Sequence, residues 1–351
     1  MEIIDFRSDT VTKPTKEMRQ AMYDAEVGDD SRRDDPTTIK LEALAAEITG
    51  KEEGLLMASG SMGNLVSVLV NTNRGDEIIQ GHRSHFYTTE SGAASGIGSV
   101  QTKVIQNGPR GEFQPEDVKN AIQGTAYFLP RTKLLSIENT HNNCGGTVQT
   151  KDEMTNAINI MHNAGIKVHL DGARIFNAAV YLKTTTKDLC TDIDDLTFCL
   201  SKGLSAPIGS VLCGTHEFIE EARRARQSLG GALRQSGIIS AAGILALTTM
   251  IDRLEDDHEN AKYLATLLSN ISHISVNHDK VQTNMVYCAF DNNVFGNTEI
   301  KSLLDNIGIK TIGSNDDLRF VTHRHITKKH IEIAANRINK MVKEQISSFQ
   351  K

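Results

Sequence analysis

Lys202 and Asp171 are the two residues whose types and positions most directly suggest chemistry. Each follows a segment that is predicted to be a strand, 196–200 before Lys202 and 167–170 before Asp171. A semi-buried lysine loses its proton readily, and its neutral amine can form a Schiff base. A carboxylate can keep a heterocyclic nitrogen protonated, as pyridoxal phosphate requires. The pair favours that cofactor, against the simpler interpretations of a surface lysine and of an Asp-Gly turn.

A third feature is the glycine- and serine-rich run Ser59–Asn64, which joins an apolar segment to a helical one. Backbone N–H groups at a helix N-terminus bind phosphate, and glycine lets the phosphate approach closely. The alternative is a plain linker with a helix cap. The run matches neither G-x-x-x-x-G-K-[ST] nor G-x-G-x-x-G, so it does not support nucleotide binding.

Of three histidines considered, two could take part in chemistry and one is expected to be structural. His85 could stack on a cofactor ring, and His141 could act as an acid or base, because histidine titrates near neutral pH. Their alternative roles are a buried packing residue and a hydrogen-bonded loop residue. His169 lies inside the run before Asp171, and we assign it a structural role.

Metal binding is not expected. His82 with His85, and His323 with His325, have tolerable spacing for ligands. Neither pair has neighbouring carboxylates or thiols that would complete a closed site.

The elements that must position these residues alternate between strand and helix. Apolar runs predict strands at 133–137, 167–170, 196–200 and 211–213, and helical spacing predicts helices at 36–49, 62–71, 151–164 and 236–251. Such alternation predicts an α/β fold with a mostly parallel sheet and helices on both faces. Ligands bind such sheets beyond the carboxyl ends of the strands, where Asp171, Lys202 and His141 are all expected.

The chain divides by pattern near residue 251. Residues 1–251 are expected to form an N-terminal segment and a large cofactor-binding domain. Residues 252–351, with strands expected at 283–290 and 318–322 and a terminal helix, are expected to form a smaller α+β domain.

Composition excludes several classes of protein. The 351 residues carry a net charge of −6, which gives no electrostatic footprint for nucleic acid. The most apolar stretch, 237–250, is too short and too polar to span a bilayer. The N-terminus has no signal-peptide pattern. The five cysteines are odd in number and lack C-x-x-C spacing, so reduced thiols and a cytoplasmic location are expected.

Taken together, the motifs resemble those of the L-threonine aldolases of the low-specificity type. The resemblance extends from Asp5 to about Thr322 and rests on these segments: 5–12 (DFRSDTVT), 27–30 (VGDD), 34–37 (DDPT), 138–142 (ENTHN), 169–177 (HLDGARIFN), 200–204 (LSKGL), 234–237 (RQSG) and 318–323 (LRFVTH). It implies the fold-type-I architecture of pyridoxal-phosphate enzymes, shared with aspartate aminotransferase. It also implies a homotetramer of two tight dimers, with active sites at the dimer interface.

The resemblance also implies a role for each site residue. Lys202 would be the Schiff-base lysine, Asp171 the partner of the pyridine nitrogen, and His85 the residue stacked on the ring. Residues expected to bind the phosphate are Gly60, Ser61, Met62 and, from a neighbouring subunit, Arg234. Residues expected to bind the substrate carboxylate are Ser8, Arg174 (which also contacts the cofactor) and Arg319. His141 would lie near the substrate hydroxyl.

The reaction implied is cleavage of the Cα–Cβ bond of threonine or allo-threonine to glycine and acetaldehyde. The same lysine and aspartate would serve β-elimination, racemisation or transamination, so another enzyme of this fold is the alternative. A nucleotide-binding Rossmann protein and a non-catalytic binding homologue are less well supported. The chain departs from the resemblance at Ser31–Arg33, where an aromatic residue and a glycine are common, and at Gln227, where some relatives carry a lysine.

Overall fold

The computed structural model describes residues 2–296 and 298–349. The chain forms two compact units, Lys13–Ile251 and a smaller unit made of Met1–Thr12 with Asp252–Lys351. In the part of the chain that is described, no single helix is long and apolar enough to cross a membrane, although the broken pair 237–249 and 254–269 has the length and composition to do so together.

The larger unit alternates strands and helices, as the sequence predicts. Its strands are β2 (Glu53–Met57), β3 (Glu77–Gly81), β4 (Gln101–Ile105), β5 (Thr132–Glu138), β6 (Lys167–Asp171), β7 (Asp195–Cys199) and β8 (Ser210–Gly214). Its α-helices are α1 (Lys16–Tyr23), α2 (Pro36–Thr49), α3 (Gly60–Asn71), α4 (His85–Thr88), α5 (Ala93–Gly96), α6 (Pro115–Ala121), α7 (Lys151–Asn163), α8 (Ile175–Leu182), α9 (Thr186–Leu189), α10 (His216–Ser228) and α11 (Gly237–Thr249).

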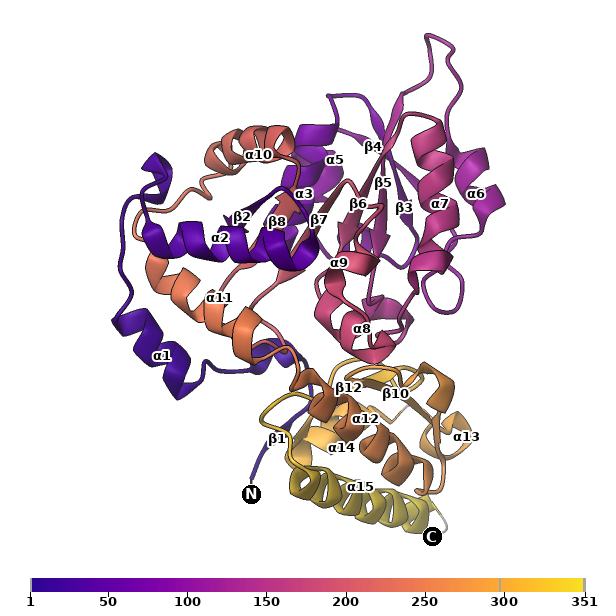
Figure 1. The fold of residues 1–351 in the computed structure, drawn as a ribbon. Helices are drawn as coiled ribbons and strands as arrows, with labels where there is room; N and C mark the ends of the chain where they lie inside the picture. Colours follow the sequence, from indigo (N-terminus) through magenta and orange to yellow (C-terminus); the bar gives the residue numbers. More distant parts are fainter. Residues whose placement is uncertain (1, 297, 350–351) are drawn as a thin grey trace. The chain divides into compact units, whose positions relative to one another are not determined.

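The seven strands form one sheet in the order β2-β8-β7-β6-β5-β3-β4 (Figure 1). Strands β4, β3, β5, β6 and β7 are parallel, and β8 runs antiparallel to both of its neighbours. This confirms the mostly parallel sheet. Glu138 pairs with Asp171 and Asp171 pairs with Thr197, so the carboxyl ends of β5, β6 and β7 meet at one edge.

Helices cover both faces of this sheet. Leu55 and Met57 of β2 pack with residues of α3 and α10 on one face. On the opposite face, a Cβ added to Gly54 would lie 2.6 Å from the Glu42 carbonyl oxygen of α2. Gly63 allows α3 to approach the sheet, because a Cβ there would lie 2.4 Å from Thr197 Oγ1 of β7. α3 therefore lies unusually close to the strands that carry Asp171.

Local sequence explains where the helices begin and end. Asp35 caps α2 by accepting a 2.8 Å hydrogen bond from the N–H of Thr38, Pro36 occupies the first turn, and Gly50 ends the helix with a φ of 69°. Ser59 caps α3 in the same way through the N–H of Met62. That cap starts α3 at Gly60, two residues before the predicted start.

The smaller unit is an α+β assembly. It contains β9 (Ile274–Val276), β10 (Met285–Phe290), β11 (Ile309–Lys310), β12 (Leu318–Val321), α12 (Leu254–Ser269), α13 (Asn292–Phe295), α14 (Ile300–Asn306) and α15 (Lys328–Phe349). β12, β10 and β9 form an antiparallel sheet, and α12 and α15 pack against each other.

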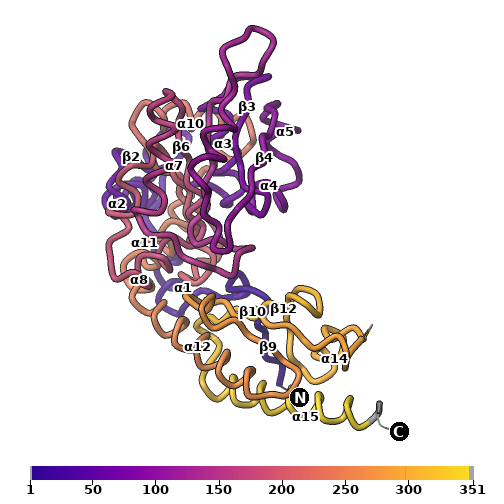
Figure 2. Tube along the Cα trace, turned by 90° about the vertical axis from the view of Figure 1, so that its right-hand side faces the viewer, coloured from indigo at the N-terminus to yellow at the C-terminus, as the bar shows by residue number. Residues whose placement is uncertain are grey.

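The N-terminal segment, which the sequence analysis groups with residues 13–251, instead packs with this smaller unit. β1 (Ile4–Asp5) pairs in parallel with β11, and Phe6 packs edge-on against Phe320 at 5.5 Å. In Figure 2 the indigo N-terminal strand lies among the orange and yellow elements. A two-residue strand carries no periodic signal, so only its long-range partner reveals where it belongs.

Candidate active site

Lys202 and Asp171 lie at the same edge of the sheet, on adjacent strands. Asp171 is the last residue of β6 and is only 4% exposed. Lys202 follows β7 in a turn closed by a hydrogen bond from Ser205 N to the Lys202 carbonyl oxygen, and it is half-buried. The topology thus brings together the amine and the carboxylate that the sequence singles out.

The N-terminus of α3 opens at this edge as well. β2 runs parallel to β7, because both are antiparallel to β8, so the turn after β2 reaches the carboxyl edge of the sheet. The first turn of α3 holds Gly60, Ser61 and Met62. The N–H of Met62 is already bonded to Ser59 Oγ at 3.2 Å. The positive end of the helix dipole favours an anion at this turn.

His85 begins α4 and is held from two sides. Its Nδ1 lies 2.8 Å from Glu90 Oε1, and its backbone N–H donates to Glu138 Oε2 at 2.8 Å. The hydrogen bond with buried Glu90 raises the pKa of His85, although partial burial opposes the shift. Nδ1 is committed to Glu90, so the ring orientation is fixed.

His141 is a fully buried polar residue, and neither nitrogen of its ring has a hydrogen-bond partner among the described residues. The carboxylate Glu138 Oε2 stays 3.8 Å from Nε2. Leaving a buried polar group unpaired costs roughly 1–3 kcal/mol. This histidine therefore indicates a site that a bound molecule completes.

The backbone of Gly111 packs closely against the His141 ring. A Cβ added to Gly111 would lie 2.3 Å from His141 Cδ2, and the backbone there has a φ of +95°. Both facts require glycine. The loop between β4 and α6 therefore packs directly on the imidazole.

Arg174 lies at the N-terminus of α8, just after Asp171. It is 6% exposed, and its Nη1 donates to Asn142 Oδ1 at 3.2 Å. The backbone N–H of Asn142 in turn donates to Glu138 Oε1 at 2.8 Å. Glu138 thus fixes the segments that carry His85, His141 and Arg174. The sequence analysis quotes Glu138 within its motif but gives it no role.

Ser8 and Arg319 belong to the smaller unit. Arg319 lies on β12, is 8% exposed, and its Nη2 donates to the Arg7 carbonyl oxygen at 3.0 Å. Ser8 is the next residue in the chain and caps a short 3-10 turn through the N–H of Thr10. The two predicted carboxylate-binding residues are therefore neighbours within their own unit.

Arg234 lies on the surface of the larger unit. Its side chain is 69% exposed and makes one long ion pair, 3.4 Å to Asp29. Gln227 is exposed, and Arg33 pairs with Glu220 at 2.7 Å. Arg226 is the buried arginine of this region. It pairs with Asp30 at 2.8 Å and donates to the Leu56 carbonyl oxygen.

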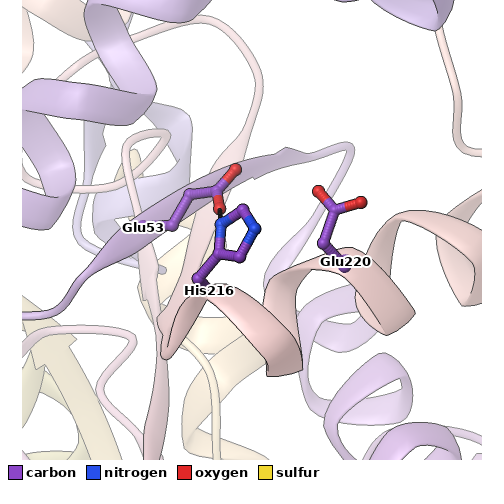
Figure 3. A group of neighbouring side chains, drawn as sticks. All are labelled: Glu53, His216 and Glu220. Atoms are coloured by element: carbon purple, nitrogen blue, oxygen red, sulfur yellow. Dashed lines mark hydrogen bonds and ion pairs between the residues drawn. The ribbon is translucent and has the colours of Figure 1, made fainter.

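One group outside this edge has the composition of a metal site. Figure 3 shows His216 and Glu220, one turn apart on α10, beside Glu53 of β2. His216 Nδ1 lies 2.7 Å from Glu53 Oε2, and the two carboxylates also pair with Arg223 and Arg33, each at 2.7 Å. Two arginines thus already balance the charge of this exposed group.

The carboxyl edge carries the kinds of group that pyridoxal phosphate requires: a helix N-terminus suited to a phosphate, the buried carboxylate of Asp171, the imidazole of His85 and the amine of Lys202. The unpaired buried nitrogens of His141 are atoms that a bound cofactor and substrate could satisfy.

Comparison with known proteins agrees with this geometry. The family model described as Beta-eliminating lyase matches residues 5–291. The chain is 40% identical to Low-specificity L-threonine aldolase 1 of Arabidopsis thaliana, covering 94% of each chain. It is 38% identical to the Low specificity L-threonine aldolase of Escherichia coli strain K12, covering 95% of this chain and 98% of the other.

Solved structures share the fold. A threonine aldolase from Leishmania major matches with a TM-score of 0.81 at 18% identity, over 96% of this chain and 99% of that one. An aspartate aminotransferase from Rhizobium meliloti matches with a TM-score of 0.70 at 14% identity, over 97% and 92%.

Proposed function

We propose a role for each active-site residue on the premise that this chain belongs to the Beta-eliminating lyase family and, within it, to the low-specificity L-threonine aldolases. The chain is a pyridoxal-phosphate-dependent lyase that cleaves L-threonine and L-allo-threonine to glycine and acetaldehyde. The observation that carries the proposal is the meeting of Lys202, Asp171 and the α3 N-terminus at one sheet edge, beside the unpaired His141.

The cofactor, when bound, supplies a protonated ring that takes up the electron pair of the broken Cα–Cβ bond. Lys202 Nζ would hold the cofactor covalently. The Asp171 carboxylate would keep the ring nitrogen protonated. His85, whose Nδ1 is bonded to Glu90, would stack on the ring. The amides of Gly60 and Ser61 would receive the phosphate beside that of Met62, which is bonded to Ser59 Oγ.

The substrate is held by its carboxylate and cleaved at its hydroxyl. Arg174, Arg319 and Ser8 bind the carboxylate, and the planar guanidinium of arginine can bond both oxygens at once. His141 takes the proton from the β-hydroxyl as the Cα–Cβ bond breaks. The hydroxyl carbon leaves as the aldehyde, and a proton added at Cα gives glycine.

We also propose a cytoplasmic homotetramer whose active sites lie at subunit interfaces. The exposed side chain of Arg234, with its single long ion pair, is available to reach the phosphate of a neighbouring subunit.

The substrate range is tested by measuring acetaldehyde release from both threonine diastereomers by the purified, cofactor-loaded protein. Release from both L-threonine and L-allo-threonine is expected. Release from neither would contradict the proposal, and release from one alone would contradict the low-specificity assignment.

Replacing His141 with phenylalanine is expected to lower kcat for cleavage by about 10²–10⁴-fold, the range for loss of a general base. Glycine binding should change little, because glycine has no hydroxyl. The matched variant His85→Phe keeps an aromatic ring and should lose less. Steady-state kinetics and a glycine titration of both variants check this, and the opposite ranking would assign the base to His85.

Replacing Arg319 with lysine is expected to weaken threonine and glycine binding together, by roughly 10- to 100-fold. The charge stays but the bidentate contact is lost, which costs about 1.5–3 kcal/mol. Cofactor content should be unchanged, because Arg319 is not among the residues proposed to hold the cofactor. Glycine titration followed by the visible spectrum checks this. Unchanged glycine affinity would leave Arg174 and Ser8 as the carboxylate ligands.

A further inference from the structure

A line of buried side chains links the core of the larger unit to Asp171. His169 Nδ1 lies 2.6 Å from Asp195 Oδ1, and His169 Nε2 lies 3.0 Å from Asn64 Oδ1. Asn64 Nδ2 then donates to Asp171 Oδ2 at 3.0 Å. All four side chains belong to residues that are 4% exposed or less. Such a fully bonded network has one stable arrangement.

The direction of each hydrogen bond follows from what its partners can accept. Asn64 Nδ2 also donates to Glu90 Oε1 at 3.0 Å, so the amide faces two carboxylates. Ionised carboxylates only accept hydrogen bonds, so the NH₂ group must point toward them. The amide oxygen therefore points to His169, whose Nε2 must carry a hydrogen. The other ring nitrogen, Nδ1, is hydrogen-bonded to Asp195 Oδ1.

The fold brings these residues together from three elements. His169 and Asp171 are two residues apart on β6, so they point to the same face of the sheet. Asn64 comes from α3, which packs on that face, and Asp195 begins the neighbouring β7. Asn71, two turns further along α3, fixes Asp195 Oδ2 at 2.9 Å. Both ends of the line are thus anchored.

The amide of Asn64 organises two parts of the active site at once. It holds Asp171, and it holds the Glu90 oxygen that bonds His85 Nδ1. If the amide turned over, its oxygen would face two carboxylates and repel both. The hydrogen bond from His169 prevents that turn.

We propose that His169 and Asn64 are positioning residues, which act through a hydrogen-bond line to hold Asp171 in the orientation that keeps the cofactor ring nitrogen protonated. The proposal rests on the proposed function, in which Asp171 serves that nitrogen. It gives His169 more than the structural role assigned from sequence.

Two substitutions of His169 distinguish the loss of its hydrogen bond to Asn64 from the loss of its packed ring. A glutamine can place its amide nitrogen where Nε2 lies and keep the bond to Asn64. An asparagine can place its nitrogen where Nδ1 lies and keep only the bond to Asp195. Both variants remove the ring, so both should lose similar thermal stability. His162→Gln is the control, because His162 pairs with Asp194 at 2.8 Å, outside the line.

The probe is pyridoxal phosphate labelled with ¹⁵N in its ring, bound to each full-length protein. In wild type and His169→Gln, the ¹⁵N chemical shift should report a protonated nitrogen. In His169→Asn it should move toward the unprotonated value, and the cofactor Kd should rise about 10- to 100-fold, the effect of one hydrogen bond to a charged group. His162→Gln should match wild type.

Equal effects of the two His169 variants, or no effect of either on the ¹⁵N shift, would overturn the proposal. If both prove too unstable to purify, Asn64→Leu keeps a side chain of similar size and removes the bonds to His169 and Asp171. That variant should show the same change in ¹⁵N shift, and a wild-type value would overturn the proposal. A wild-type protein that bound no cofactor would instead overturn the proposed function.

Discussion

Replacing Lys202 with alanine is expected to lower threonine cleavage by roughly 10⁴-fold or more, the scale of loss when a covalent group is removed. The lysine follows β7 at the carboxyl edge of the sheet, and in the proposed function its amine would hold the cofactor aldehyde. Without it, the cofactor binds only through its phosphate and ring. Acetaldehyde formation measures turnover, and borohydride reduction followed by peptide mapping locates the attached cofactor.

The matched control is Lys167→Ala. Lys167 begins β6 at the opposite edge, with a 60% exposed side chain and a surface ion pair to Asp194 at 2.7 Å. Such pairs contribute little, so activity should stay near wild type. Finding the reduced cofactor on a lysine other than Lys202 would contradict both the assigned residue and the assigned edge of the sheet.

Replacing Asp171 with asparagine is expected to remove most activity, by about 10²-fold or more, with the fold intact. The N–H of Ala173 and the amide of Asn64 contact Asp171, and an asparagine oxygen can still accept one of these bonds. A neutral amide cannot hold the ring proton by charge, so the electron sink weakens.

Asp194→Asn controls for the loss of a hydrogen-bonded carboxylate elsewhere in the same sheet. Asp194 accepts bonds from Lys167 and the Val168 N–H at the amino end of the sheet. Its removal should affect stability more than kcat. Kinetics and thermal unfolding of both variants separate the two effects. Near-normal turnover of Asp171→Asn would contradict the proposed role of Asp171 and leave it only the structural role of a turn residue.

Much of the site could be predicted because it lies where apolar runs end. β6 (KVHLD) and β7 (DLTFC) are short, mostly buried strands, and the polar residues Asp171 at the end of β6 and Lys202 after β7 mark the carboxyl edge of the sheet. The ends of α2 could also be predicted, since Pro36 favours the first turn of a helix and Gly50 its end. The sheet class and the positions of Lys202 and Asp171 followed from these signals.

Two strands of the larger unit escaped prediction for different reasons. β3 (EIIQG) is buried throughout but carries polar Glu77 and Gln80. β4 (QTKVI) is an edge strand that is mostly half-buried, with polar residues at its start. Neither segment shows a clear apolar run or strict alternation. They become strands because they pair with neighbouring strands in the folded sheet.

Contacts between residues that lie far apart in the sequence could not be predicted from the sequence. Asn64, His169 and Asp195 come from three elements, and only the folded sheet brings them into hydrogen-bond contact. The same holds for Gly111, whose lack of a side chain makes room for His141. A sequence pattern reports local periodicity, whereas these contacts depend on register and on the close packing of α3.

The central claim is carbon–carbon bond cleavage, and a product balance with L-threonine tests it most directly. The cofactor-loaded protein should form glycine and acetaldehyde in equal amounts, with no change in ammonia. A β-eliminating lyase acting on the same residues would instead form 2-oxobutanoate and ammonia, and a racemase would only invert Cα. Either of those results, with no glycine formed, would contradict the account.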